Sequence, residues 1–172
     1  HVYGPHIFHT SNPKIWEYVN RFTEFNGYHH KVLTMHKGEV YSMPINLATI
    51  NKFYKKSFTP LEAREFIQNE INRDKIENPS NLEEKAISLI GRPLYEAFIK
   101  GYTQKQWEID PTKLPASIIT RLPVRFNYND RYFNDSYEGI PKDGYTKVFE
   151  RIFNNSKIHI QRLWYKNKDT RK

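Results

Sequence analysis

The sequence LIGRPLYEAFIKGYTQKQW, residues 89–107, decides how the chain folds. Apolar and aromatic side chains recur in it at spacings of three and four residues, which predicts an amphipathic helix. Pro93 suits the first turn of such a helix, where a backbone N–H has no partner within the helix. We therefore expect this helix to be central. Its recurring residues are Leu94, Tyr95, Phe98, Ile99 and Tyr102.

The segment that follows mixes aromatic rings with fixed positive charge. Residues 114–135 read LPASIITRLPVRFNYNDRYFND. Aromatic rings can stack on a nucleobase, and an arginine fork can pair with two phosphate oxygens. This mixture favours a nucleotide-binding function. On the residues alone, core packing of the rings and solvated charges at Arg121 and Arg125 are the alternative.

The composition narrows the classes of protein. With 172 residues, the chain can form one ordinary domain or two small lobes. It has no cysteine, which excludes disulfides and thiolate catalysis. No apolar run approaches the roughly 20 residues of a membrane-spanning helix, so we expect a cytoplasmic protein. The net charge of +8 fits either a basic solvated surface or an anionic partner.

Capping residues and periodicity predict four or five helices between Asn12 and Trp107. A helix should run from Asn12 to Gly27 with Ile15 and Trp16 among its buried residues. Residues 32–42 predict a hairpin that turns at Lys37-Gly38, with Val32, Met35 and Val40 inside. Further helix starts are expected at Asn46, at Thr59-Pro60 and at the pattern Ser80 to Glu83.

The C-terminal third has a different pattern. Alternating Tyr, Phe and Asn over 125–138 predicts strands, a turn follows at 140–144, and a helix should then run to Asn154 before a strand at 157–163. We expect an α+β fold (from an α/β parent), with a helical-bundle lobe of four to five helices and part of a mixed or antiparallel sheet. The predicted divisions are a flavin-domain end (1–11), the lobe (12–108), a mobile loop (109–124), a sheet segment with one helix (125–163) and a tail (164–172).

Several long strings resemble bacterial UDP-galactopyranose mutase. They are the two quoted above together with YGPHIFHT at 3–10, MPINLATIN at 43–51 and YEGIPKDGYT at 137–146. The resemblance runs from His1 to about Gln161. The family's flavin-binding fingerprint would precede this region and another active-site arginine would follow it. We therefore expect a fragment that is inactive by itself.

The resemblance implies a flavin-dependent isomerase. The family interconverts UDP-galactopyranose and UDP-galactofuranose for cell-surface polysaccharide, and N5 of reduced FAD acts as nucleophile on the anomeric carbon. The cofactor then performs the covalent step, while the protein binds and orients. UDP-galactose and UDP are the implied ligands, and the parent is expected to be a homodimer without a nucleic-acid partner or membrane insertion.

The resemblance also assigns roles to single residues. It implies that Arg121 lies on a mobile loop that closes over the diphosphate, and that Tyr132 hydrogen-bonds a phosphate beside Phe133. An arginine that arrives with loop closure can stabilise the charge that develops on UDP when the anomeric bond breaks. The positions implied to bind uridine are Phe98, Tyr102, Thr103 and Trp107.

Three histidines have separate predictions. The resemblance implies that the loop with His6 and His9 lies against the flavin, which makes His6 a candidate catalytic residue as well. The family often has asparagine near the uracil where this chain has His30, so a ligand contact from His30 departs from the pattern. We expect no metal, because Gly4-Pro5 favours a loop and no carboxylate lies nearby in sequence.

Two other classes of function fit the composition. A nucleic-acid-binding module would use the same basic and aromatic mixture. Against it, the rings lie in amphipathic helices, the charges are dispersed, and no known nucleic-acid-binding motif is present. A non-catalytic interaction domain is the third alternative.

Overall fold

The computed structural model describes residues 6–119 and 123–154, which fall into two compact units. Unit 1 comprises residues 1–28 and 135–172, and unit 2 comprises residues 29–134. Helices and two antiparallel two-stranded sheets make up the described elements, which confirms the predicted α+β class. The strand expected at 157–163 and the tail lie outside the described residues.

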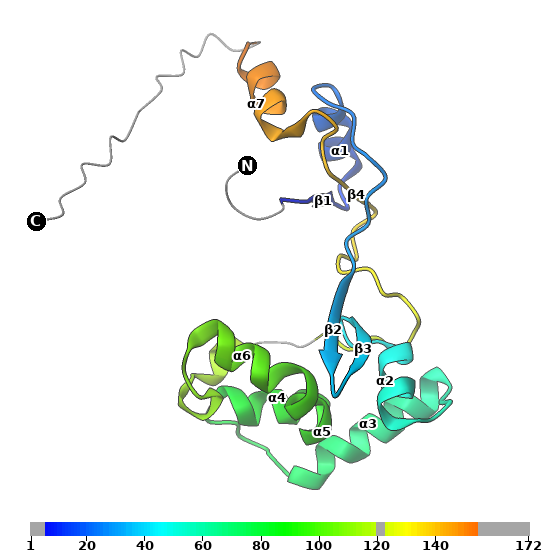
Figure 1. Cartoon of the computed structure of the whole chain (residues 1–172), viewed down its shortest axis with the longest axis vertical. Helices are drawn as coiled ribbons and strands as arrows, with labels where there is room; N and C mark the ends of the chain where they lie inside the picture. Colours follow the sequence, from blue (N-terminus) through cyan, green and yellow to red (C-terminus); the bar gives the residue numbers. More distant parts are fainter. Residues whose placement is uncertain (1–5, 120–122, 155–172) are drawn as a thin grey trace, which may run out of the picture. The chain divides into compact units, whose positions relative to one another are not determined.

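Unit 2 contains a hairpin with helices gathered around it (Figure 1). One helix runs without a break from Arg92 to Trp107 through three consecutive elements, as the opening pattern predicts. Its middle element is a π-helix, in which each backbone N–H bonds to the carbonyl five residues earlier, one residue further than in an α-helix. The elements of unit 2 are β2 (Val32–His36), β3 (Glu39–Met43), α2 (Leu47–Tyr54), α3 (Pro60–Asp74), α4 (Leu82–Ile90), α5 (Arg92–Leu94), the π-helix η1 (Tyr95–Ile99), α6 (Lys100–Trp107) and the 3₁₀ turns η2 (Pro111–Lys113) and η3 (Ala116–Ile118).

Side-chain caps fix where the helices of unit 2 begin. Thr59 and Glu62 form a reciprocal capping box at α3, as predicted. The side chain of Asn46 accepts the backbone N–H of Thr49 at α2. At α4 the capping residue is Asn81 rather than the predicted Ser80, because the Asn81 side chain is the one that accepts a backbone N–H of the first turn.

The core of unit 2 packs mainly against the inner side of the long helix. Leu94 and Tyr95 are fully buried, and Phe98 is 6% exposed. The Tyr95 hydroxyl donates a 2.7 Å hydrogen bond to Oε2 of Glu83, and burial raises the pKa of Tyr95 above its ordinary value. The other buried members of this core are Tyr41, Ile45, Leu47, Ile50, Ala63, Ile67, Ala86, Ile87 and Ile90.

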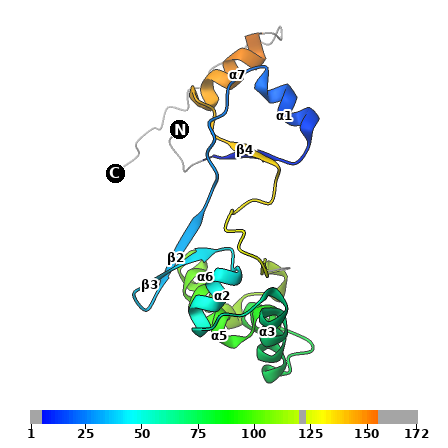
Figure 2. The same ribbon diagram turned by 90° about the vertical axis from the view of Figure 1, so that its right-hand side faces the viewer.

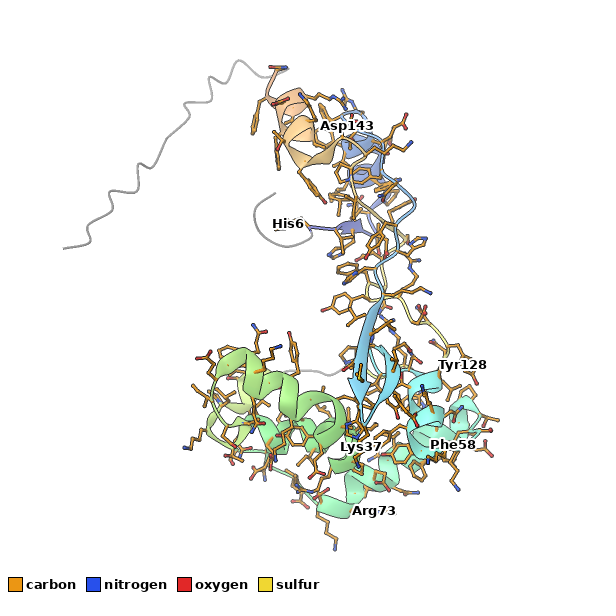
Figure 3. All side chains as sticks on the ribbon, viewed as in Figure 1. His6, Lys37, Phe58, Arg73, Tyr128 and Asp143 are labelled. Carbon is orange, nitrogen blue, oxygen red and sulfur yellow. The ribbon has the colours of Figure 1, made fainter. Side chains whose placement is uncertain are left out.

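The hairpin of β2 and β3 turns at Lys37-Gly38, as predicted (Figure 3). Of the three residues predicted to lie inside, Val32 is half-buried on the same face as His36, but Met35 and Val40 are 70% and 49% exposed. His36 and Tyr41 face the core instead, and each ring packs edge-on against Phe98. Side chains alternate along a strand, so placing these rings inside puts Met35 and Val40 outside.

Unit 1 pairs β1 (Phe8–Thr10) with β4 (Tyr137–Gly139), and α1 (Pro13–Asn20) and α7 (Gly144–Asn154) lie on one side of the pair (Figure 2). The Trp16 ring stacks on Tyr137 at 5.1 Å between centroids and packs against Phe25 at 4.8 Å. These rings, with Phe8, form the aromatic centre of the unit.

Helix α1 is shorter than predicted. It ends at Asn20 rather than near Gly27, and Ile15 on its surface is 46% exposed rather than buried. The reason is Asn26, whose backbone N–H donates to the Ile140 carbonyl and whose side chain accepts the Ile140 N–H, both at 3.0 Å. These bonds draw the segment after α1 out of the helical path. The sequence placed α1 in the helical lobe, whereas its contacts group it with unit 1.

Of the strands predicted over 125–138, the structure forms only the end, in β4, and residues 125–136 form no strand. Within the described residues their only ladder contact is an isolated bridge between Lys31 and Arg131. The side chains of Asn127 and Asn129 each accept the backbone N–H two residues further on, at 3.0 and 3.1 Å. Such local bonds are typical of turns and compete with a sheet.

Candidate functional site

The long helix presents two large rings to solvent. Tyr102 is 69% exposed and Trp107 is 48% exposed, whereas Thr103 between them is 5% exposed. In a regular α-helix Tyr102 would follow Phe98 on the buried face, because residues four apart share a face. The π-helix η1 adds one residue to the turn, since the Lys100 N–H bonds to the Tyr95 carbonyl. This shift places Thr103 inward and turns Tyr102 outward.

Exposed rings at this position have chemical consequences. Tyr102, Lys105 and Gln106 line an open hollow on the surface of α6. Tyrosine and tryptophan present flat apolar faces with one polar group each, which suits a ligand that has both a ring and polar edges. π-helical turns occur frequently at functional sites. The outer face of α6 is therefore a candidate site for a planar ligand.

The chain beyond α6 holds the end of this helix. Glu108 ends the helix in the left-handed conformation, with φ of 53°. Asp110 then accepts the backbone N–H and the hydroxyl of Thr112 at 3.0 and 2.6 Å, and these bonds lower the pKa of Asp110. The Leu114 carbonyl accepts the N–H of Leu82 at 2.8 Å, which ties the segment to α4. Trp107 thus lies at a fixed helix end.

A second group of rings lies at the start of the hairpin. The ring centroids of His30 and Tyr132 are 5.3 Å apart, those of His30 and Phe133 are 6.1 Å apart, and those of Tyr132 and Phe133 are 5.0 Å apart. The Tyr132 N–H donates to the His30 carbonyl at 2.7 Å. Tyr132 remains 48% exposed. The structure therefore brings three of the predicted substrate-binding residues into one cluster, which we call the His30 cluster.

The loop that carries Tyr132 is held by residues that were not singled out as site residues from the sequence. The guanidinium of Arg125 donates to the carbonyls of Asn129, Arg131 and Tyr132. Nζ of Lys31 bonds to Asp130 at 2.8 Å and lowers the pKa of that carboxyl. From the sequence, Arg125 was expected to be a solvated charge.

Arg121, the predicted catalytic arginine, lies outside the described residues. Its flanks are described: Ile119 before it and Val124 after it are half-buried and pack against the core of unit 2. That core also carries Phe98 on the long helix.

The predicted flavin-facing histidines are in unit 1. Nδ1 of His9 lies 2.6 Å from Oδ2 of Asp135, and the Ser11 hydroxyl donates to Oδ1 of the same carboxylate at 2.7 Å. These two bonds, the one from Ser11 foremost, lower the pKa of Asp135. The His6 ring meets Tyr145 edge-on with centroids 6.5 Å apart. Both histidines are exposed.

No group of three or more His, Cys, Asp or Glu side chains in residues 6–119 and 123–154 is arranged to hold a metal ion. In the same ranges, no helix combines the length and the apolar character needed to cross a membrane.

Comparison with known proteins identifies the family resemblance. The family model described as UDP-galactopyranose mutase matches residues 97–171, which include α6, the Arg125 loop and α7. The resemblance inferred from the sequence is confirmed. The matched part contains all the predicted substrate-binding residues except His30.

Curated relatives extend the match over nearly the whole chain. A probable UDP-galactopyranose mutase of Klebsiella pneumoniae is 52% identical over 161 residues, which are 94% of this chain and 42% of that protein. A dTDP-fucopyranose mutase of Escherichia coli is 45% identical with the same coverage. A UDP-galactopyranose mutase of Mycoplasma genitalium is 29% identical over 94% of this chain and 41% of that protein. The chain thus spans about two fifths of the length of these relatives.

Proposed function

We propose that this chain provides the nucleotide-sugar-binding surface of a mutase that interconverts UDP-galactopyranose and UDP-galactofuranose. The observation that carries the proposal is the outward turn of Tyr102 and Trp107 on α6, inside the segment that matches the mutase family. Burying a large aromatic ring lowers the free energy, so rings left exposed on a helix are available for a ligand. Two exposed rings on one helix favour a ligand surface.

The two rings are proposed to bind the uracil end of the substrate. A nucleobase gains about 1–3 kcal/mol from stacking on an aromatic side chain. Tyr102 and Trp107 have the exposed area for this contact, whereas Thr103 and Phe98 are buried. The proposed role of Phe98 and Thr103 is to form the floor under the rings.

The phosphates are proposed to contact the hydroxyl of Tyr132 and the guanidinium of Arg121. Cleavage of the anomeric bond adds negative charge to UDP, and a positive group held near the diphosphate stabilises that charge. The His30 cluster supports the part assigned to Tyr132, because it holds the ring while leaving it half exposed. His30 itself is proposed to border the nucleotide through this cluster.

The proposed cofactor is FAD in its reduced form, which when bound supplies the nucleophile for the anomeric carbon. The described residues fit it only in part. His6 and His9 are exposed imidazoles that can donate hydrogen bonds to a flavin, and Asp135 holds the ring of His9. The sequence contains no G-x-G-x-x-G turn to bind the cofactor's phosphates. We also propose that the whole protein is located in the cytoplasm and forms a homodimer.

A second candidate has a different sugar nucleotide. The relative named dTDP-fucopyranose mutase is 45% identical to this chain, so dTDP-fucopyranose is the alternative substrate. Both candidates require a surface for a pyrimidine base and a diphosphate. dTDP differs from UDP by a methyl group on the base, worth about 1 kcal/mol in an apolar contact, and by the absence of the ribose 2′-hydroxyl. Competition between UDP and dTDP therefore separates the two.

Tryptophan fluorescence tests the proposal. The chain has three tryptophans, and Trp107 is the one on the exposed face of α6. Saturable quenching by UDP is expected in the wild type and in Trp16→Phe, because Trp16 packs inside unit 1, and it should be lost in Trp107→Phe. Quenching by short oligonucleotides with the same Trp107 dependence, and none by UDP, would instead support a nucleic-acid module.

A further inference from the structure

Arg125 makes an unusual set of contacts for an arginine close to the surface. Nη1 donates to the Asn129 carbonyl at 3.2 Å and to the Arg131 carbonyl, and Nη2 donates to the Tyr132 carbonyl at 3.2 Å. One side chain thus satisfies three carbonyls within four residues. The planar guanidinium fork suits this arrangement, because it presents five N–H donors in fixed directions from two nitrogens that can reach different carbonyls.

The backbone of Arg125 is attached to the core. Its N–H donates to the Ile45 carbonyl at 2.9 Å, and the Leu47 N–H donates to the Asn127 carbonyl at 2.9 Å. Asn46 lies between these two contacts and is fully buried, with its amide donating to Oγ of Ser42 at 2.8 Å. Arg125 therefore extends from a rigid mount at the start of α2.

Besides Arg125, the loop is held by the bond from Nζ of Lys31 to Asp130 and by the ring contacts of the His30 cluster. Its backbone contacts are the two asparagine turns and the bond from the Tyr132 N–H to the His30 carbonyl. Three carbonyl dipoles point toward one place, which is unfavourable without a positive group between them. The neighbouring Tyr128 is 67% exposed and lies at the outer edge of the unit (Figure 3). The Arg125 charge thus stabilises the three inward-pointing carbonyls, which these other contacts of the loop do not reach.

These contacts leave the Arg125 side chain little capacity to bind a phosphate directly. A guanidinium with three bonds to carbonyls of its own chain has few N–H groups left for a phosphate. We propose that Arg125 is a positioning residue for nucleotide binding, which acts by holding the 129–133 loop so that the Tyr132 hydroxyl faces the diphosphate. This inference rests on the proposed function.

A double-variant cycle in UDP binding tests the inference. Arg125→Lys retains the charge but loses the fork, and Tyr132→Phe removes the hydroxyl that the fork is proposed to present. Each single variant should weaken UDP binding about tenfold, the effect of about one hydrogen bond to a charged group. If Arg125 acts through Tyr132, the double variant should bind no more weakly than the weaker single variant. Calorimetric titration of the protein with UDP measures all four affinities.

The matched control is Arg64→Lys. Arg64 stacks over the Phe126 ring at 4.6 Å, so it is an arginine in contact with the residue next to Arg125 but without bonds to the loop. Its replacement should leave UDP affinity within about twofold of the wild type, as for surface changes away from a site. A loss equal to that of Arg125→Lys would show general damage to this region and overturn the inference.

Amide hydrogen exchange separates failure of the inference from failure of the proposed function. Arg125→Lys should speed exchange at the Tyr132 amide, while amides in α3 keep their wild-type rates. If the wild type binds no UDP, the proposed function is wrong, and Tyr132 exchange still decides whether Arg125 holds the loop. Multiplicative losses in the double variant, or unchanged exchange at Tyr132, would overturn the positioning role.

Discussion

Gly91 lies where α4 meets α5, and replacing it with alanine should strongly destabilise unit 2. Its φ of 78° and ψ of 155° lie in a region that side chains rarely adopt, which costs about 1–3 kcal/mol. An added Cβ would also lie 2.9 Å from Cβ of Glu70 and 3.4 Å from the Glu70 carbonyl carbon. Glu70 is 3% exposed and paired with Arg73 at 2.5 Å, so it cannot move aside cheaply.

The two effects together predict a loss of about 3–5 kcal/mol in the free energy of unfolding for Gly91→Ala. Gly101→Ala is the matched control, because Gly101 is helical and a Cβ there meets nothing within 4 Å. Alanine should raise stability there by about 0.5–1 kcal/mol. Urea unfolding followed by circular dichroism measures both. A wild-type midpoint for Gly91→Ala, or an equal loss at Gly101→Ala, would refute the reasoning.

Three further predictions concern the stability of unit 2. Leu94→Ala should cost about 2–5 kcal/mol in thermal unfolding, because Leu94 is fully buried, and a value near zero would remove it from the core. Tyr95→Phe should cost about 1–3 kcal/mol in urea unfolding, since it leaves the Glu83 carboxylate without the 2.7 Å hydroxyl donor. Bonds from Thr59 lower the pKa of Glu62, so the contribution of this cap to the free energy of unfolding is complete above the unfolded pKa and is lost as the pH falls through the folded pKa. Glu62→Gln removes this titration. The melting temperature of the variant should therefore fall less than that of the wild type as the pH falls through the folded pKa of Glu62, and an identical pH profile would contradict this.

The sequence predicts most accurately the elements that local interactions determine. The capping box at Thr59 and Glu62 needs only residues three apart, and α3 begins where that pattern places it. The turn at Lys37-Gly38 is also local, since Gly38 adopts a positive φ of 80° that suits glycine. These features depend little on the rest of the chain.

Predictions fail where distant residues decide between two faces. The hairpin could bury either side of its alternating pattern. His36 and Tyr41 are on the inner side because they pack against the rings of Phe53 and Phe98, which come from later helices. Helix α1 could have continued past Asn20, but the bonds between Asn26 and Ile140 join residues more than a hundred positions apart. No window of sequence contains both partners.

In the candidate site, the sequence pattern also places one side chain on the wrong face of its helix. A helical pattern with period 3.6 assigns Tyr102 to the buried face with Phe98, yet the π-helix gives that place to Thr103. The sequence pattern contains no local signal for the extra residue in this turn. The residue types thus suggest that Tyr102 could stack on a nucleobase, but the helical pattern places its ring on the buried face. Because the helix that carries the ring is anchored in the core through Tyr95, the outward position of Tyr102 is set by packing on the opposite side of the helix.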